Sequence, residues 1–141
     1  MKILYGIQGT GNGHISRCRK MAAHFSARGA EVTYLLSGRP HDKLFDMECF
    51  GNFEHRRGLT MVQVDGKVDY LRTTFETPAW EFVRDVRALN VRDYDLVITD
   101  FEPVTAWAAK LAGKTCIGIG HQYAFGHSIP RKGGNPLAET V

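Results

Sequence analysis

The glycine-rich stretch "GIQGTGNGH", residues 6–14, is the feature that most constrains the fold. It follows a short apolar run from Lys2 to Ile7 and precedes a segment whose apolar residues recur at helical spacing as far as Gly29. A β-branched and aromatic run, "EVTYLLSG", comes next, as is typical of a strand. Strand, glycine loop, helix and strand in this order predict a βαβ unit with parallel strands and a right-handed crossover.

A second unit of the same kind lies near the other end of the sequence. "YDLVITD" is typical of a buried strand that ends at Asp100, "PVTAWAAKLAG" of a helix between Pro103 and Gly113, and "KTCIGIG" of another strand. The alternation predicts an α/β fold, a doubly wound Rossmann-like parallel sheet with helices on both faces. Between the units, Asp65-Gly66 separates two alternating segments and predicts a hairpin near residues 61–71 that projects from the sheet.

The remaining middle segments have weaker periodicity. "PHDKLFDMECF" is interpreted as one amphipathic helix, and a second helix is expected to begin at Thr77 and Pro78. Trp107 in the later helix is expected in the core. The buried side of the helix after Pro78 is expected to hold four apolar residues: Trp80, Val83, Val86 and Leu89.

Length and composition exclude several classes of protein. The chain of 141 residues suits a single domain, and its net charge of +3 is scattered, which does not indicate a nucleic-acid partner. Cys18, Cys49 and Cys116 lie far apart without paired spacing, which argues against disulfides and a structural zinc site. No stretch resembles a signal peptide or a membrane span. We therefore expect a cytoplasmic protein.

Two polar side chains are expected to meet at the sheet edge. Ligands of doubly wound sheets bind beyond the carboxyl ends of the strands, where the strand order reverses. If the first strand lies beside the strand that ends at Asp100, then His14 and Asp100 emerge together, with His121 one strand further along. A histidine at a helix N-terminus favours the neutral form, and a carboxylate on its other nitrogen fixes the tautomer. The pair is typical of a general base for a substrate hydroxyl; the alternative is a capping histidine, with Asp100 and Glu102 capping the next helix.

The glycine loop is interpreted as an anion site. Gly9, Gly11 and Gly13 permit positive φ and leave no Cβ to block a ligand from the backbone N–H groups. The loop lacks the lysine of a phosphate-binding P-loop and is a poor match to the dinucleotide fingerprint, so a tight turn without a ligand is the alternative.

Taken together, "KILYGIQGTGNGHISRCRKMA" and "DLVITDFEPVTAWAAKLAGKTCIGIGHQYAF" resemble the N-terminal domain of GT-B glycosyltransferases, close to MurG-like and UDP-glucuronosyltransferase-like members. The resemblance implies an inverting transferase of two Rossmann-like domains. The N-terminal domain would bind a small-molecule or lipid-linked acceptor, and the C-terminal domain a nucleotide-sugar, expected to be UDP-linked. It implies no metal and no other cofactor.

The resemblance also assigns residues. His14 matches the family's loop histidine, a general base, and Asp100 the acid that supports it. Two residues depart from the MurG-type loop: Asn12 replaces a glycine and Arg17 a proline. The residues expected to face the donor diphosphate or substrate are Gly9, Thr10, Gly11, Asn12 and Gly13. The residues expected to bind the acceptor are Glu102, His121, Gln122 and Tyr123, whose polar and aromatic groups suit polyhydroxylated ligands.

The domain organisation follows from the same resemblance. Residues 1–130 would form the N-terminal domain, and residues 131–141 a loop and the start of a missing element, so that the chain is a fragment. By itself it is expected to bind acceptor weakly and to catalyse nothing. A lipid acceptor would place the protein at the inner face of the membrane, with "KLFDMECFGNFEHRR" as a contact; otherwise this stretch is an ordinary packed helix and loop.

Two other functions remain open at this point. The glycine loop and Arg39, which could meet a 2′-phosphate, also suit an NADP-dependent oxidoreductase domain. The same pocket without chemistry would suit a non-catalytic carbohydrate- or nucleotide-binding module.

Overall fold

The computed structural model describes residues 1–59, 63–64, 67–68 and 79–120. These residues alternate between strands and helices. In chain order the elements are β1 (Lys2–Gln8), α1 (Asn12–Ala27), β2 (Glu31–Ser37), the 3₁₀ turns η1 (His41–Lys43) and η2 (Glu48–Phe50), β3 (Glu54–His55), β4 (Gln63–Val64), β5 (Lys67–Val68), α3 (Ala79–Ala88), β6 (Leu96–Asp100), α4 (Pro103–Ala112) and β7 (Cys116–Gly118).

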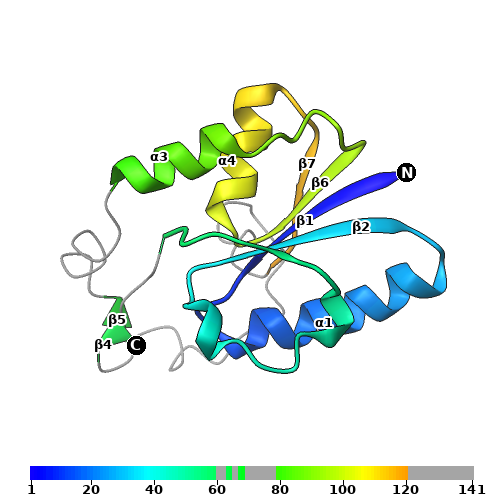
Figure 1. Ribbon diagram of the computed structural model, residues 1–141, viewed down its shortest axis with the longest axis horizontal. Helices are drawn as coiled ribbons and strands as arrows, with labels where there is room; N and C mark the ends of the chain where they lie inside the picture. The colour runs from blue at the N-terminus through cyan, green and yellow to red at the C-terminus, as the bar shows by residue number, and fades with distance from the viewer. Residues whose placement is uncertain (60–62, 65–66, 69–78, 121–141) are drawn as a thin grey trace, which may run out of the picture.

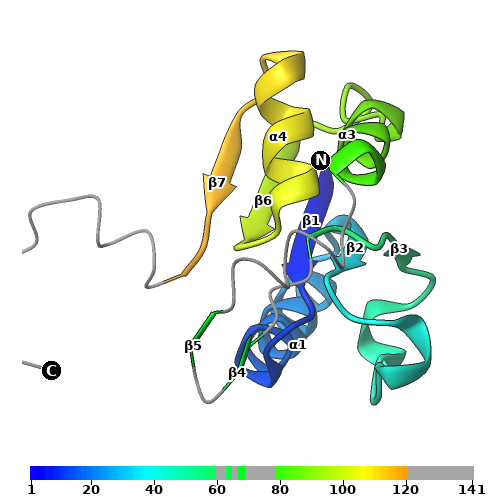
Figure 2. The same ribbon diagram turned by 90° about the vertical axis from the view of Figure 1, so that its left-hand side faces the viewer.

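The main sheet has five parallel strands in the order β3-β2-β1-β6-β7. Helix α1 covers one face, and α3 and α4 cover the other (Figures 1 and 2). The predicted α/β doubly wound fold is therefore confirmed. Strands β4 and β5 form a separate antiparallel pair, as expected of the hairpin near residues 61–71, although the residues that would join them, 65–66, lie outside the described part. No helix in the described ranges is long and apolar enough to cross a membrane.

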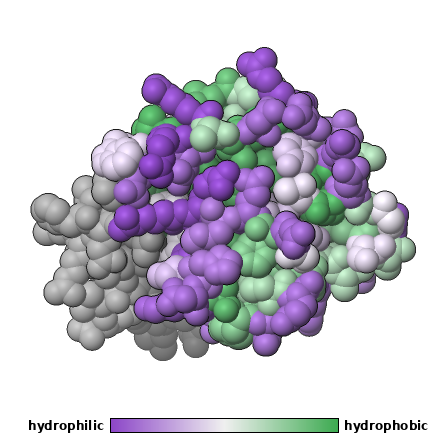
Figure 3. Space-filling view, in the orientation of Figure 1, coloured by the Kyte–Doolittle hydropathy of each residue, from purple (hydrophilic) through white to green (hydrophobic). Residues whose placement is uncertain are grey.

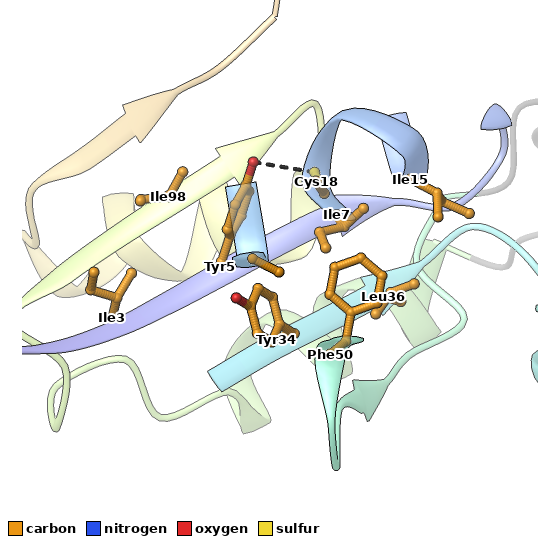
Figure 4. Packing of buried hydrophobic residues seen from close by; sticks show 10 residues of the cluster. Ile3, Tyr5, Ile7, Ile15, Cys18, Tyr34, Leu36, Phe50 and Ile98 are labelled. Atoms are coloured by element: carbon orange, nitrogen blue, oxygen red, sulfur yellow. Dashed lines mark hydrogen bonds between the residues drawn. The ribbon is translucent and has the colours of Figure 1, made fainter. Parts of the chain in front are cut away.

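Alternation along β1 produces two cores. Ile3, Tyr5 and Ile7 are fully buried and pack toward α1 with residues such as Cys18 (Figure 4). Leu4 belongs to the opposite cluster, with residues of α3, α4 and β6. A strand with apolar residues on both faces occurs only where helices cover both faces of the sheet. The central position of β1 then fixes where the loop after it emerges.

The segment between β2 and β3 differs from the prediction. It forms η1 and η2 instead of one amphipathic helix. The apolar residues are only loosely periodic, so no single face of a helix could bury them all. Phe50 is buried in the α1 core, and Arg19 of α1 donates to the carbonyl oxygens of Phe45 and Asp46. Much of the stretch considered as a membrane contact is thus packed against α1.

The prediction that both tryptophans lie in the core is wrong. Trp80 is 62% exposed, Trp107 is 48% exposed, and Val83 is 43% exposed. Helix α3 buries its Val86 side against β1, β2 and α4, which turns the Trp80 and Val83 side outward. The space-filling view shows apolar side chains among polar ones on the molecular surface (Figure 3). A helical stripe alone does not reveal which of two apolar arcs faces the sheet.

Gly6 sets the distance between β1 and α4, and its replacement is expected to be costly. A Cβ at Gly6 would overlap the side-chain oxygen of Thr105 and would lie 2.9 Å from Oε2 of Glu102. Overpacking of this kind costs about 1–3 kcal/mol, so Gly6→Ala should lower the free energy of unfolding by that amount in urea denaturation. Gly13→Ala is the matched control, because a Cβ at Gly13 would meet nothing within 4 Å in the described part of the chain beyond its own helix and chain neighbours. Equal stability of the two variants would contradict the packing argument.

Candidate active site

The topology brings His14 and Asp100 together. Strand β1 pairs with β6 in parallel, with Ile7 opposite Asp100, so the loop after β1 and the end of β6 share one edge of the sheet. His14 lies in the first turn of α1, directly after that loop. Its Nδ1 is 2.6 Å from Oδ1 of Asp100. His14 and Asp100 are therefore in contact, as the expected strand order predicted.

Asp100 is fully buried and is held by three side chains. Besides His14, Arg17 donates from Nε to Oδ2 at 2.8 Å and from Nη2 to Oδ1, and the Cys18 thiol lies 3.2 Å from Oδ2. Burial alone would raise the pKa of Asp100, but the hydrogen bonds from Arg17, His14 and Cys18 outweigh it and hold the pKa below its ordinary value. Asp100 is therefore an anion around neutral pH.

This anion determines which nitrogen of His14 carries a proton in the neutral ring. A carboxylate can only accept, so Nδ1 donates to Asp100 and Nε2 is left with a lone pair. Nη2 of Arg17 lies 3.2 Å from Nδ1, but both groups carry hydrogens there, so this contact is no hydrogen bond. The side chain of His14 is 16% exposed, which leaves the ring partly accessible. A partly accessible imidazole with a lone pair on Nε2 can accept a proton from a ligand hydroxyl.

Tyr5 and Cys18 extend the network into the core. The Cys18 thiol lies 3.2 Å from the hydroxyl oxygen of Tyr5, the contact drawn in Figure 4. Burial raises the pKa of Cys18 to about 12 and also raises the pKa of Tyr5. Both groups therefore stay protonated and neutral. Their side chains fill the space behind Asp100, and the thiol lies within hydrogen-bonding distance of the Tyr5 hydroxyl and the Asp100 carboxylate.

Phe101 has an unusual backbone for its residue type. Its φ of +57° lies in the left-handed region, which costs a residue with a side chain about 1–3 kcal/mol. The ring stacks on His14, with 6.1 Å between ring centroids and 11° between planes. Such strain persists where the surrounding structure imposes it, often at functional sites. Here the strained residue connects Asp100 to the cap of α4.

Glu102 has a different role from the expected contact with an acceptor. It is fully buried at the N-cap of α4, where its carboxylate accepts from the backbone N–H groups of Val104 and Thr105 and from the hydroxyls of Thr105 and Ser37. Burial raises its pKa, although these hydrogen bonds oppose the rise. The acceptor assignment is corrected: the carboxylate is occupied by capping, the alternative that the sequence had left open.

The glycine loop is built differently from the expectation. Gly9, Gly11 and Gly13 do not have positive φ. Gly9 is needed for close packing. Its N–H donates to the carbonyl oxygen of Ser37 at 2.7 Å, and the Cβ of any other residue at this position would lie 2.9 Å from that oxygen. Arg39 holds the loop by donating to Oδ1 of Asn12 and to the carbonyl oxygen of Thr10. The first turn of α1 contains no acidic residue, which leaves its N-terminus suited to an anion.

Three of the predicted acceptor-binding residues lie outside the described part of the chain: His121, Gln122 and Tyr123. Residues 131–141 lie outside it as well. Within the described ranges, no three His, Cys, Asp or Glu side chains are grouped as metal ligands would be.

Arg17 and Phe101 were not identified as site residues from the sequence. Arg17 follows His14 by three residues, and that spacing places two side chains on the same helix face, which is a signal that could have identified it. Phe101 gives no such signal, because its position over His14 depends on a left-handed backbone that no side-chain pattern encodes.

The Asp100 network should make stability depend on pH. Because the folded pKa of Asp100 is lowered, its contribution is present above its unfolded pKa of about 3.9 and is lost as the pH falls through the folded pKa. Asp100→Asn should lower the free energy of unfolding by about 1–3 kcal/mol near pH 7. Urea denaturation of both proteins from about pH 7 to about pH 3 should show the difference shrinking toward acid pH. A difference that does not change with pH would contradict the prediction.

The fold and site define a Rossmann-like α/β domain with a histidine–carboxylate pair at the carboxyl end of its central strands. A family model described as "Glycosyl transferase family 1" matches residues 1–129. The chain therefore belongs to glycosyl transferase family 1.

Solved structures that are similar to this chain include the following two. The C-terminal domain (residues 83–215) of PF1911 hydrogenase from Pyrococcus furiosus aligns with a TM-score of 0.51 and 15% identity, over 84% of this chain and 90% of that one. MurG from Acinetobacter baumannii aligns with a TM-score of 0.49 and 16% identity, over 83% of this chain and 34% of that one. No curated protein matches significantly. At such identities the structural likeness concerns the fold alone.

Proposed function

We propose that the chain is the acceptor-binding half of an inverting glycosyltransferase, with His14 as the general base and Asp100 as the residue that orients it. The observation that carries the proposal is the 2.6 Å contact between Nδ1 of His14 and Oδ1 of the buried Asp100. Membership of a glycosyl transferase family supplies the class of reaction. The NADP-dependent alternative gains no support from this family match.

The reaction is a single displacement. Nε2 of His14 accepts the proton of the acceptor hydroxyl while that oxygen attacks the anomeric carbon of a nucleotide-sugar. The bond from the anomeric carbon to the diphosphate oxygen breaks, and the nucleoside diphosphate leaves with the electron pair. One displacement inverts the anomeric configuration. The imidazolium that forms is stabilised by the Asp100 carboxylate.

The loop of residues 9–13 is proposed to face the departing diphosphate. The N-terminus of α1 carries partial positive charge and has no acidic residue in its first turn, so it favours negative charge that develops nearby. In the proposal, a second, donor-binding domain supplies the nucleotide-sugar, which is expected to be UDP-linked, and no metal takes part. The protein is proposed to act in the cytoplasm, and a lipid-linked acceptor would bring it to the membrane.

The proposal is tested by a transfer assay with the full-length protein, nucleotide-sugar donors and candidate acceptors. Wild-type protein should form a product of inverted anomeric configuration, and His14→Ala should form almost none while still binding acceptor. Undiminished transfer by the variant would contradict the assignment of the base. Micromolar binding of NADP, without sugar transfer, would favour the oxidoreductase alternative instead.

A further inference from the structure

A pocket of about 210 Å³ lies where the start of α4 meets the end of β1. Its walls come from Leu59, Phe101, Pro103, Ala106 and Trp107, with Gln8 and Glu102 completing the lining. Trp107 is 48% exposed, so the pocket has an aromatic side chain that also reaches solvent. Apart from Gln8 and Glu102, its side chains are apolar.

The pocket adjoins the candidate base. Phe101 is part of its wall, and the same ring stacks on His14. Asp100, which holds His14, is the residue directly before Phe101. A group bound in the pocket is therefore one aromatic ring away from the imidazole that would deprotonate the acceptor.

The polar side chains of the wall are already occupied. Gln8 donates from Nε2 to Oγ1 of Thr10 and to the carbonyl oxygen of Leu59. Both carboxylate oxygens of Glu102 accept two hydrogen bonds each from within the protein. Gln8 and Glu102 are also 2% and 0% exposed, so they present almost no polar surface to the hydroxyls of a sugar. Pairing the Gln8 amide donors or the Glu102 carboxylate with such hydroxyls would break internal hydrogen bonds, which is costly for buried groups.

We propose that this pocket binds an apolar group of the acceptor, an alkyl or aryl substituent attached close to the hydroxyl that His14 deprotonates. The inference rests on the proposed function, because it identifies the occupant as acceptor. The volume is below the roughly 300–1,000 Å³ of sites that enclose drug-sized ligands, so the pocket suits one substituent and not a whole acceptor. Sugar hydroxyls of the same acceptor would remain outside it.

The test compares octyl β-glucoside, below its micelle concentration, with methyl β-glucoside by calorimetric titration of the full-length protein. The two probes share the sugar and differ by seven methylenes. Burying only two methylenes changes affinity by about tenfold or more, so octyl β-glucoside should bind at least about tenfold more tightly. Ala106→Phe, which fills the pocket, should remove that difference. Binding is measured without donor, so the result does not depend on whether His14 is the base.

The control variant is Leu111→Ala. Leu111 is 67% exposed on the same helix and is not part of this pocket. It should leave octyl β-glucoside binding unchanged, whereas adsorption to exposed apolar surface would weaken in it. Ala106→Leu replaces Ala106→Phe if thermal unfolding shows that the larger residue is not accommodated. Equal affinity for the two glucosides, no binding of either, loss of binding in Leu111→Ala, or unchanged octyl selectivity in a folded Ala106 variant would overturn the proposal.

Discussion

Replacing His14 with alanine is expected to lower kcat for sugar transfer by about a hundredfold to ten-thousandfold, while KM for the acceptor changes little. The reason is that, in the proposed mechanism, His14 removes the proton of the acceptor hydroxyl as its oxygen attacks. The proposed contribution of the imidazole is to the chemical step, and the ring is only partly exposed, so its removal should alter binding much less than turnover. Initial rates over a range of acceptor concentrations, with saturating nucleotide-sugar, separate the two parameters.

His24→Ala is the matched control for this variant. His24 lies on the same helix as His14 and is exposed, ten residues further along. Its replacement should leave kcat and KM near their wild-type values. If the His14 variant lost activity only through a large rise in KM, the residue would bind acceptor instead of removing its proton, and the proposed mechanism would fail.

Asp100→Asn is expected to lower kcat by about a hundredfold or more, although an amide has nearly the same size as a carboxylate. An aspartate that only accepts keeps the proton of neutral His14 on Nδ1. An asparagine can turn its NH₂ toward Nδ1, which moves the ring proton to Nε2 and leaves no lone pair for the acceptor hydroxyl. The rate is measured on protein that remains folded at the assay temperature, since the substitution also weakens the contact with Arg17.

Asp85→Asn controls for the loss of a buried aspartate as such. Asp85 is 6% exposed on α3, where it pairs with Arg84 at 3.4 Å, and it is not part of the His14 network. Its replacement should not change kcat. Wild-type turnover in the Asp100 variant would mean that the carboxylate serves stability and does not orient the base.

The central geometry of the site was predictable because it follows from chain connectivity. Two βαβ units with right-handed crossovers place the strand before the glycine loop beside the strand that ends at Asp100. Residues separated by 86 positions in the chain then meet without any local signal between them. The capping role of Glu102 was also accessible, since an acid directly before a proline at the start of a helix is typical of an N-cap.

Features that depend on how the helices pack against the sheet were not predictable. Trp80 and Trp107 lie on apolar helical stripes, yet both are exposed, because the packing of each helix decides which side is buried. Arg17 was considered only as a departure from a family pattern, because its role depends on Asp100, which lies on strand β6 and not on the helix of Arg17. Such pairings require the three-dimensional register of α1 against β6.

Asp100, Phe101 and Glu102 are consecutive, yet they contact three different parts of the molecule: the His14 ring, the pocket and the first turn of α4. A turn of three residues therefore joins the start of α4 to the carboxylate that contacts His14. If a bound substituent displaced the first turn of α4, we expect that the Asp100 carboxylate would move with it. Occupancy of the pocket and the orientation of the His14 ring would then depend on the same three residues.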